Sequence, residues 1–187
     1  MDQEMKLLST TIEGVSLVEI NLFQDLRGSF SRLFCESDFS SLLGTRKIIQ
    51  INRSLTVTPG TVRGMHFQYP PHAETKFISC NKGRIWDVAV DLRLGSPTFL
   101  RWHAEELSSQ NARMLIIPEG CAHGFQALDP DSELLYFHTN FYTPEAEGGV
   151  LHDDPQLNIS WPLPIINLSD RDQGYPLISQ DFNGIRV

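Results

Sequence analysis

Short stretches in which apolar and polar residues alternate recur along most of the chain, and this pattern is typical of half-buried β-strands. Residues 12 to 24 hold the first, including the run Val15–Ile20, and a second strand is expected around Phe30, Leu33 and Phe34. From Ile48 onward, strands and turns follow one another. Further strands are predicted over Ile85–Leu92, Phe99–Glu105, Arg113–Ile117, Gly124–Leu128 and Glu133–Tyr142.

Helical signals are sparse. Ser37–Gly44 combines serines at its start, apolar spacing and a terminal glycine, which predicts a helix of about two turns. Many short strands with Gly and Pro turns and hardly any helix predict an all-β sandwich or barrel. The chain shows no repeat or linker, and its 187 residues fit one domain over 1–187.

The proline-rich tail from Asp154 to Pro176 is expected to be an ordered, loop-rich segment that wraps around the barrel. Otherwise Trp161, Ile165 and Ile166 would be left exposed to water.

Charge and cysteine content narrow the function classes. The chain has 23 acidic and 15 basic residues and a formal charge of -8, which argues against nucleic-acid binding and against a basic membrane-binding surface. No apolar run approaches the roughly 20 residues that span a bilayer. Cys35, Cys80 and Cys121 show no paired spacing, and no signal segment precedes them. We expect buried or half-buried thiols in a soluble, cytoplasmic protein.

The most suggestive chemistry lies in the stretch Arg63–Gln68, followed ten residues after His66 by Lys76. A histidine can remove a proton next to a carbonyl, and a lysine can neutralise the oxyanion that results. A lone histidine beside apolar residues is more often structural than catalytic, so these two residues gain weight only if the fold brings them together.

A second feature is the alternation within Glu133–Tyr142. Period two places Leu134, Tyr136, His138, Asn140 and Tyr142 on one face, which is the more polar one. In a small barrel, a polar inner face lines a ligand cavity, and two tyrosines there suit a proton donor and a stacking platform. The alternative is that both tyrosines are amphipathic residues at the barrel rim.

Several motifs together resemble the dTDP-4-dehydrorhamnose 3,5-epimerase family, from about Asp25 to Pro176. They are Asp25–Gly28, Gln50–Ser54, Arg63–Gln68, Pro70-Pro71, Lys76–Ile78, Asp87–Arg93, Ser96–Thr98, Ile117–Phe125, Asp153–Pro155, Trp161-Pro162 and Leu168–Asp172. The resemblance implies a cupin-type jelly roll (a double-stranded β-helix) with one or two short helices and a loop-rich C-terminal segment. It also implies a homodimer that takes a nucleotide-diphosphate sugar as substrate.

The resemblance further implies a mechanism without cofactor or metal. His66, backed by Asp172, would remove the proton at C5 or C3 of a 4-keto-6-deoxyhexose, Lys76 would steady the enolate, and Tyr136 would reprotonate the opposite face. From the sequence alone, Asp170 competes with Asp172 for the place behind His66. A carboxylate in that place fixes the tautomer of the imidazole and stabilises the imidazolium.

Contacts to the nucleotide and diphosphate are implied for a larger set. Phe23 and Phe30 would line the nucleotide side and Tyr142 would stack on the base. The remaining binding residues would be Arg27, Gln50, Asn52, Arg63, His123, Glu147 and Arg171.

One position departs from the resemblance. Arg32 stands where the family carries a glutamate near the nucleotide, and arginine only donates hydrogen bonds whereas glutamate accepts them. Arg32 could bind a different base, such as cytosine, or it could pair with a phosphate or a neighbouring acid. Glu74 in place of the common glutamine is a milder change.

Three alternatives remain open from the sequence. A metal-dependent cupin could use His66, His72, Glu74 and His123 as ligands, although the usual paired His-x-His is absent. A non-catalytic sugar-nucleotide binder would be expected to lack one of the four implied catalytic residues, and all four are present. An epimerase could also invert one centre rather than two, since the pose of the substrate decides which proton His66 reaches.

Overall fold

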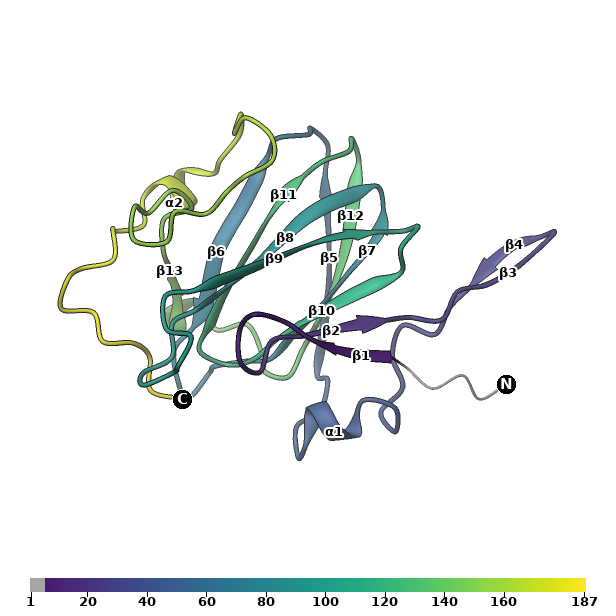
Figure 1. Ribbon diagram of the computed structural model, residues 1–187, viewed down its shortest axis with the longest axis horizontal. Coiled ribbons are helices and arrows are strands. Elements are labelled where there is room, and N and C mark those ends of the chain that lie inside the picture. Colours follow the sequence, from purple (N-terminus) through teal and green to yellow (C-terminus); the bar gives the residue numbers. More distant parts are fainter. Residues whose placement is uncertain (1–5) are drawn as a thin grey trace.

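Two antiparallel sheets form the body of the protein in this computed structural model, which describes residues 6–187 (Figure 1). The first sheet has six strands, in the order β1 (Lys6–Ser9), β2 (Ser16–Glu19), β10 (Arg113–Ile117), β7 (Lys76–Lys82), β12 (Ser132–His138) and β5 (Gln50–Thr56). The second has five, in the order β13 (Glu147–Gly149), β6 (Val62–Gln68), β11 (Cys121–Ala127), β8 (Arg84–Asp91) and β9 (Trp102–Ser108). The predicted all-β architecture is confirmed.

The remaining elements are short. β3 (Phe23–Asp25) and β4 (Gly28–Phe30) form a hairpin that extends away from both sheets (Figure 1). α1 (Ser40–Leu43) and α2 (Asp170–Gln173) are single helical turns, and a 3₁₀ turn covers Pro144–Ala146. Within residues 6–187, no helix is long and apolar enough to cross a bilayer.

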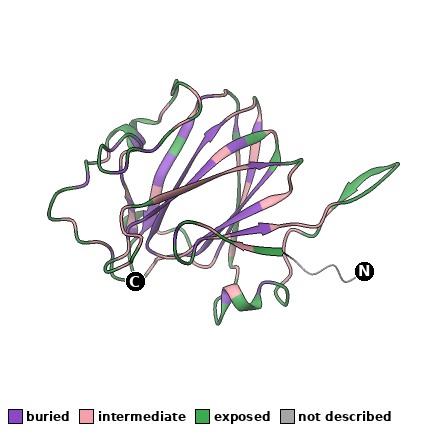
Figure 2. Cartoon of the chain, viewed as in Figure 1, coloured by how far each residue is buried: buried purple, intermediate pink, exposed green. Residues whose placement is uncertain are grey.

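The alternation of side chains produces a core between the sheets, where strands of both contribute. Ile78 and Leu115 of the six-stranded sheet pack with Ile85, Ala89 and Phe125 of the five-stranded sheet, and all five are almost fully buried. The central strands β7, β8, β10 and β11 are largely buried, whereas β1, β5 and the hairpin are mostly exposed (Figure 2). Apolar area removed from water in this way is the main stabilising term of the fold.

Each sheet also has an apolar outer face with its own cover. Leu157, Ile178 and partly buried Trp161 of the C-terminal tail pack against β6, β8 and β11. The tail is therefore an ordered wrap as predicted, although Ile166 remains 56% exposed. On the six-stranded sheet, Phe39 and Leu43 of the α1 region cover the outer face.

The structure corrects several predicted elements. Leu33 and Phe34 are not in a strand but pack under α1, and the predicted helix Ser37–Gly44 shortens to Ser40–Leu43 without a serine side-chain cap. The strand predicted over Phe99–Glu105 begins later, at Trp102, because Phe99 and Arg101 donate to Ser96 and Thr98 in tight turns. The strand predicted over Glu133–Tyr142 ends at His138, so Asn140 and Tyr142 lie in the loop that follows.

Candidate active site

A cavity of about 510 Å³ opens between the sheets and is lined by strands of both. It collects side chains from positions far apart in the sequence, because strands from residues 50 to 138 converge there. The expected site residues that line it are Asn52, Arg63, His66, Lys76, His123, Tyr136, Tyr142, Glu147, Arg171 and Asp172.

His66 and Asp172 form a carboxylate–imidazole pair, with 2.8 Å between Nε2 and Oδ1. Asp172 is buried in α2, where the Ser169 hydroxyl caps the helix by accepting from the Asp172 backbone N–H. The competing Asp170 lies exposed at the start of the same helix. Of the two acidic residues in the motif, the fold brings Asp172 to His66.

Several donors keep Asp172 ionised. Burial alone would raise the pKa of Asp172, but the bond to His66, the Gly64 backbone N–H at 3.1 Å and Arg171 lower that pKa well below its usual range. A carboxylate only accepts hydrogen bonds, so Nε2 of His66 donates to it and Nδ1 keeps the lone pair of a base. Arg171 Nη2 also lies 3.0 Å from Nε2, and Arg171 is held there by the bond that its Nε donates to Asp172 at 3.2 Å.

Lys76 lies beside His66, and its Nζ donates to the His66 carbonyl oxygen at 3.3 Å. Its ammonium is almost buried and also pairs with Glu74 Oε1 at 3.1 Å. The cavity wall thus holds a lysine ammonium beside the His66 backbone, a group that can stabilise an oxyanion.

Tyr136 comes from β12 in the opposite sheet. Its hydroxyl lies 2.9 Å from the Ser54 hydroxyl, and burial raises the pKa of Tyr136 well above its ordinary value. The phenol therefore stays protonated at neutral pH and can act as a proton donor.

His123 and Arg63 also line the cavity, and of the two only His123 is buried. His123 lies opposite His66 in the β6–β11 register, and its Nε2 contacts the wholly buried Asp87 at 2.7 Å. Burial raises the pKa of Asp87, partly offset by His123. Arg63 donates to the Thr56 hydroxyl at 3.1 Å.

Charged and aromatic side chains cross the cavity mouth. The Tyr142 hydroxyl donates to Glu147 at 2.9 Å, and Arg171 binds the same carboxylate at 2.9 and 3.1 Å. The hydrogen bond that Tyr142 donates to Glu147 raises the pKa of Tyr142. Gln50 is outside the cavity lining but accepts from the Tyr142 backbone N–H at 3.0 Å.

The structure does not bring the hairpin residues to this cavity. Phe23, Arg27, Phe30 and Arg32 line a different hollow, of about 1200 Å³, between the hairpin and the α1 region. Arg27 pairs with Asp25, and Arg32 lies 3.5 Å from Asp38. Within one chain, the expected nucleotide contacts are therefore split between two places.

The residues considered above as metal ligands lie apart or form hydrogen bonds and ion pairs with other side chains. His72 contacts Thr143, His123 contacts Asp87, and Glu74 binds Lys76 and His138. In the part of the chain that the structure describes, no three His, Cys, Asp or Glu side chains are grouped to hold a metal ion.

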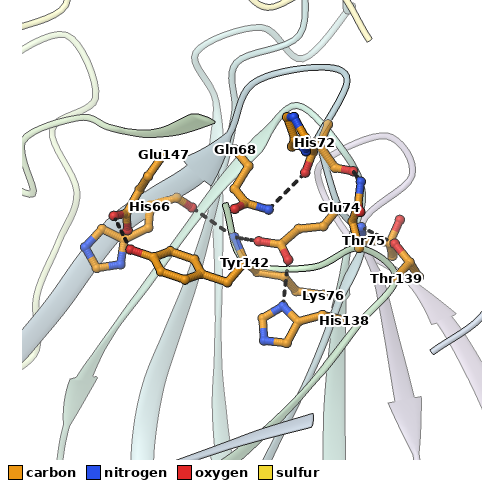
Figure 3. Close-up of polar contacts among 12 residues, drawn as sticks. His66, Gln68, His72, Glu74, Thr75, Lys76, His138, Thr139, Tyr142 and Glu147 are labelled. Carbon is orange, nitrogen blue, oxygen red and sulfur yellow. Dashed lines mark hydrogen bonds and ion pairs between the residues drawn. The ribbon is translucent and has the colours of Figure 1, made fainter. Parts of the chain in front are cut away.

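Sequence reasoning did not place Ser54, Glu74 or His138 among the epimerase site residues, although all three line the cavity. Ser54 contacts the Tyr136 hydroxyl, and Glu74 and His138 bind each other beside Lys76 (Figure 3). His138 did fall on the predicted polar face, but nothing in the local pattern joined it to Glu74, which is 64 residues away.

Comparison with known proteins agrees with this geometry. The family model described as dTDP-4-dehydrorhamnose 3,5-epimerase matches residues 9–180. A protein of that name from Sinorhizobium fredii is 40% identical over 178 residues, covering 95% of this chain and 91% of the relative.

Solved structures are also similar over most of the chain. The dTDP-6-deoxy-D-glucose-3,5-epimerase of Legionella pneumophila, in complex with dTDP-4-keto-L-rhamnose, has a TM-score of 0.90 at 37% identity and 98% coverage of both chains. A 3'-monoepimerase from Streptomyces bikiniensis, in complex with dTDP-quinovose, has a TM-score of 0.84 at 32% identity, covering 90% of this chain and 85% of the other. With this cupin-type fold and a family match over most of its length, the chain belongs to the dTDP-4-dehydrorhamnose 3,5-epimerase family.

Proposed function

We propose that the protein is a cofactor-independent epimerase of a dTDP-linked 4-keto-6-deoxyhexose in deoxysugar biosynthesis. The observation that carries the proposal is the placement of a base and an acid on facing sheets. The His66–Asp172 pair lies on the five-stranded side and the protonated Tyr136 on the six-stranded side of one cavity. A base and an acid on opposite faces of a sugar can invert a carbon without a cofactor.

In the proposed reaction, Nδ1 of His66 takes the proton from the carbon next to the C4 ketone. The electron pair of the broken C–H bond moves into the ring as an enolate, and the oxyanion at C4 is held by Lys76. Collapse of the enolate takes a proton from the Tyr136 hydroxyl on the opposite face. The Tyr136 phenolate is then reprotonated through Ser54 or water, and His66 releases its proton.

The names of the relatives support the nucleotide and leave the number of inverted centres to experiment. One solved relative is a 3,5-epimerase and another is a 3'-monoepimerase, and both carry dTDP-linked ligands. We propose inversion at both C3 and C5, with the single-centre reaction as the alternative.

Proton NMR in heavy water tests the proposal. With dTDP-4-keto-6-deoxyglucose, deuterium should enter at C3 and C5, and His66→Asn should abolish both exchanges. Exchange at one carbon only would make the protein a single-centre epimerase, and no exchange in the unaltered protein would reject the proposed reaction.

We also propose that the protein works as a homodimer in which the β3–β4 hairpin of one copy reaches the cavity of the other. The hairpin extends away from both sheets (Figure 1), and none of its residues lines the cavity of its own chain. Phe30 is 69% exposed, a large apolar side chain without cover. Arg27, Phe30 and Arg32 would then bind the nucleotide together with Asn52, Arg63 and Arg171 of the facing chain.

Mixing two inactive variants tests this arrangement. A hybrid of His66→Asn with the double variant Arg27→Ala/Phe30→Ala contains one cavity with an intact His66 and an intact hairpin from the other copy. Activity should recover on mixing if hairpins are exchanged. If each hairpin served its own cavity, the mixture would stay inactive.

A cytoplasmic location is part of the proposal, since Cys35, Cys80 and Cys121 are all free thiols. Burial raises the pKa of Cys80 and Cys121 to about 12, which keeps both unreactive. Cell fractionation checks the location, and recovery from an extracytoplasmic fraction would reject it.

A further inference from the structure

A further carboxylate–imidazole pair, Glu74 and His138, lies in the cavity wall beside Lys76, and the proposed reaction gives it no role. Glu74 Oε2 contacts His138 Nδ1 at 2.8 Å while its Oε1 pairs with Lys76 at 3.1 Å (Figure 3). All three residues are at most 9% exposed. Lys76 and His138 face each other directly in the β7–β12 register, so Glu74 bridges two neighbours on adjacent strands.

Glu74 is ionised in this setting. Burial would raise its pKa, but the hydrogen bond with His138 and the charge of Lys76 outweigh burial and hold the pKa below its ordinary value. Because the carboxylate can only accept, His138 donates through Nδ1, and Nε2 can accept from the Asn52 amide at 3.4 Å. Glu74 is therefore held by a partner on each of two adjacent strands, Lys76 on β7 and His138 on β12.

The contacts leave Lys76 with one free donor. An ammonium group carries three N–H bonds. One points to Glu74 and another to the His66 carbonyl oxygen. The remaining N–H can face the cavity, and its direction is set by the two bonds already made. A flexible lysine would otherwise sample many rotamers, at a cost in entropy when it meets the oxyanion.

We infer that Glu74 and His138 are positioning residues that hold the Lys76 ammonium in place for the oxyanion at C4. The Glu74 carboxylate also offsets the buried positive charge while the cavity is empty. The inference rests on the proposed epimerase reaction and adds two residues to it, neither of which touches the reacting carbon.

Kinetic variants separate positioning from a merely structural role. Glu74→Ala should lower kcat about 10- to 100-fold while KM for the dTDP-sugar changes less than about two-fold, because the lost alignment matters in the transition state. Glu74→Gln keeps an acceptor for Lys76 and should retain kcat within about five-fold. His138→Phe should lower kcat less than Glu74→Ala does, since Lys76 keeps its direct contact.

A double variant tests whether Glu74 acts through Lys76. In a Lys76→Met background, Glu74→Ala should lower kcat by less than about two-fold further, because the group it positions is gone. Asp154→Ala is the matched control. It removes another buried carboxylate, one that accepts from the backbone N–H groups of Gln156 and Ile178, and should lower Tm without lowering kcat.

A measurement without substrate keeps this inference separate from the proposed function. A held, buried ammonium should give a resolved proton–nitrogen NMR signal that Lys76→Met removes, Glu74→Gln retains and Glu74→Ala loses. If the unaltered protein exchanges no deuterium, the proposed function fails while this signal still tests the positioning. Three results would overturn the inference. The first is an NMR signal that is unchanged in Glu74→Ala, and the second is a Glu74→Ala effect on KM rather than on kcat. The third is a loss of kcat on Glu74→Ala that is just as large in the Lys76→Met background.

Discussion

Asp172 shows how a single residue joins stability to chemistry. Its carboxylate accepts from His66, from the Gly64 backbone and from Arg171 while almost fully buried. Because these contacts lower its pKa, the ionised form stabilises the folded state at neutral pH. That contribution is lost as the pH falls from the ordinary value through the folded one.

We therefore expect Asp172→Asn to lower the free energy of unfolding by about 2 kcal/mol at pH 7. The difference from the unaltered protein should shrink as the pH falls below about 4, the ordinary pKa of aspartate. Urea unfolding at a series of pH values measures it, and a difference that does not change with pH would contradict the explanation.

Gly64 is a second residue whose identity the fold requires. Its φ is +132°, and a Cβ there would lie 2.4 Å from the Gly124 Cα and 2.9 Å from the His123 carbonyl oxygen. Gly64→Ala should cost about 3 kcal/mol or more, through backbone strain and overpacking together.

Gly28 is the matched control for that prediction. Its φ is nearly the same, +130°, but no atom lies within 4 Å of the added Cβ. Gly28→Ala should therefore show the strain alone, about 1 kcal/mol. Equal losses in the two variants, measured by urea unfolding, would mean that the close approach of β6 and β11 is unimportant.

At the scale of elements, α2 has only four residues and yet carries Arg171 and Asp172 into the cavity. So short a helix depends on its cap and on tertiary contacts. Ser169→Ala removes the acceptor for the Asp172 backbone N–H and should cost about 1 kcal/mol of stability and several-fold in kcat.

Ser40→Ala on α1 is the comparison. The Ser40 hydroxyl donates to the Ser37 carbonyl oxygen, in a segment that covers the outer face of the other sheet. Its loss should affect thermal unfolding and leave deuterium exchange unchanged. If Ser169→Ala also left exchange unchanged, the placement of α2 would not limit the reaction.

At the scale of the whole molecule, the identity of the nucleotide depends on parts of the fold that lie apart. Arg32 is paired with Asp38 on the hairpin side, which agrees with the interpretation that it pairs with a neighbouring acid. We expect TDP at 100 times its Kd to stabilise the protein by about 2.7 kcal/mol, a Tm rise of about 5 to 10 °C.

CDP, UDP and GDP at the same concentration should raise Tm less. The thermal-shift series also tests the alternative interpretation of Arg32, in which it binds a different base such as cytosine. A larger shift with CDP than with TDP would mean that Arg32 reads a cytosine base, and would redirect the search for the substrate to CDP-linked sugars.

The sequence by itself determined the strand content, the covered tail and the residue types of the site. Alternation with period two assigns a side chain to one face of its strand, so Tyr136 and His138 were expected to share a face, and they do. The bounds of Arg113–Ile117 were predicted as observed, whereas turn hydrogen bonds displaced the start of β9.

Only the tertiary structure decided which of these side chains meet. Register between strands distant in sequence pairs His66 with His123 and Lys76 with His138, and no local pattern encodes that register. The same holds for Glu74, whose bridge depends on a β7–β12 pairing, and for the hairpin, whose direction depends on packing. Local periodicity fixes the face of a residue, but long-range pairing and packing fix its neighbours, and the neighbours set the chemistry.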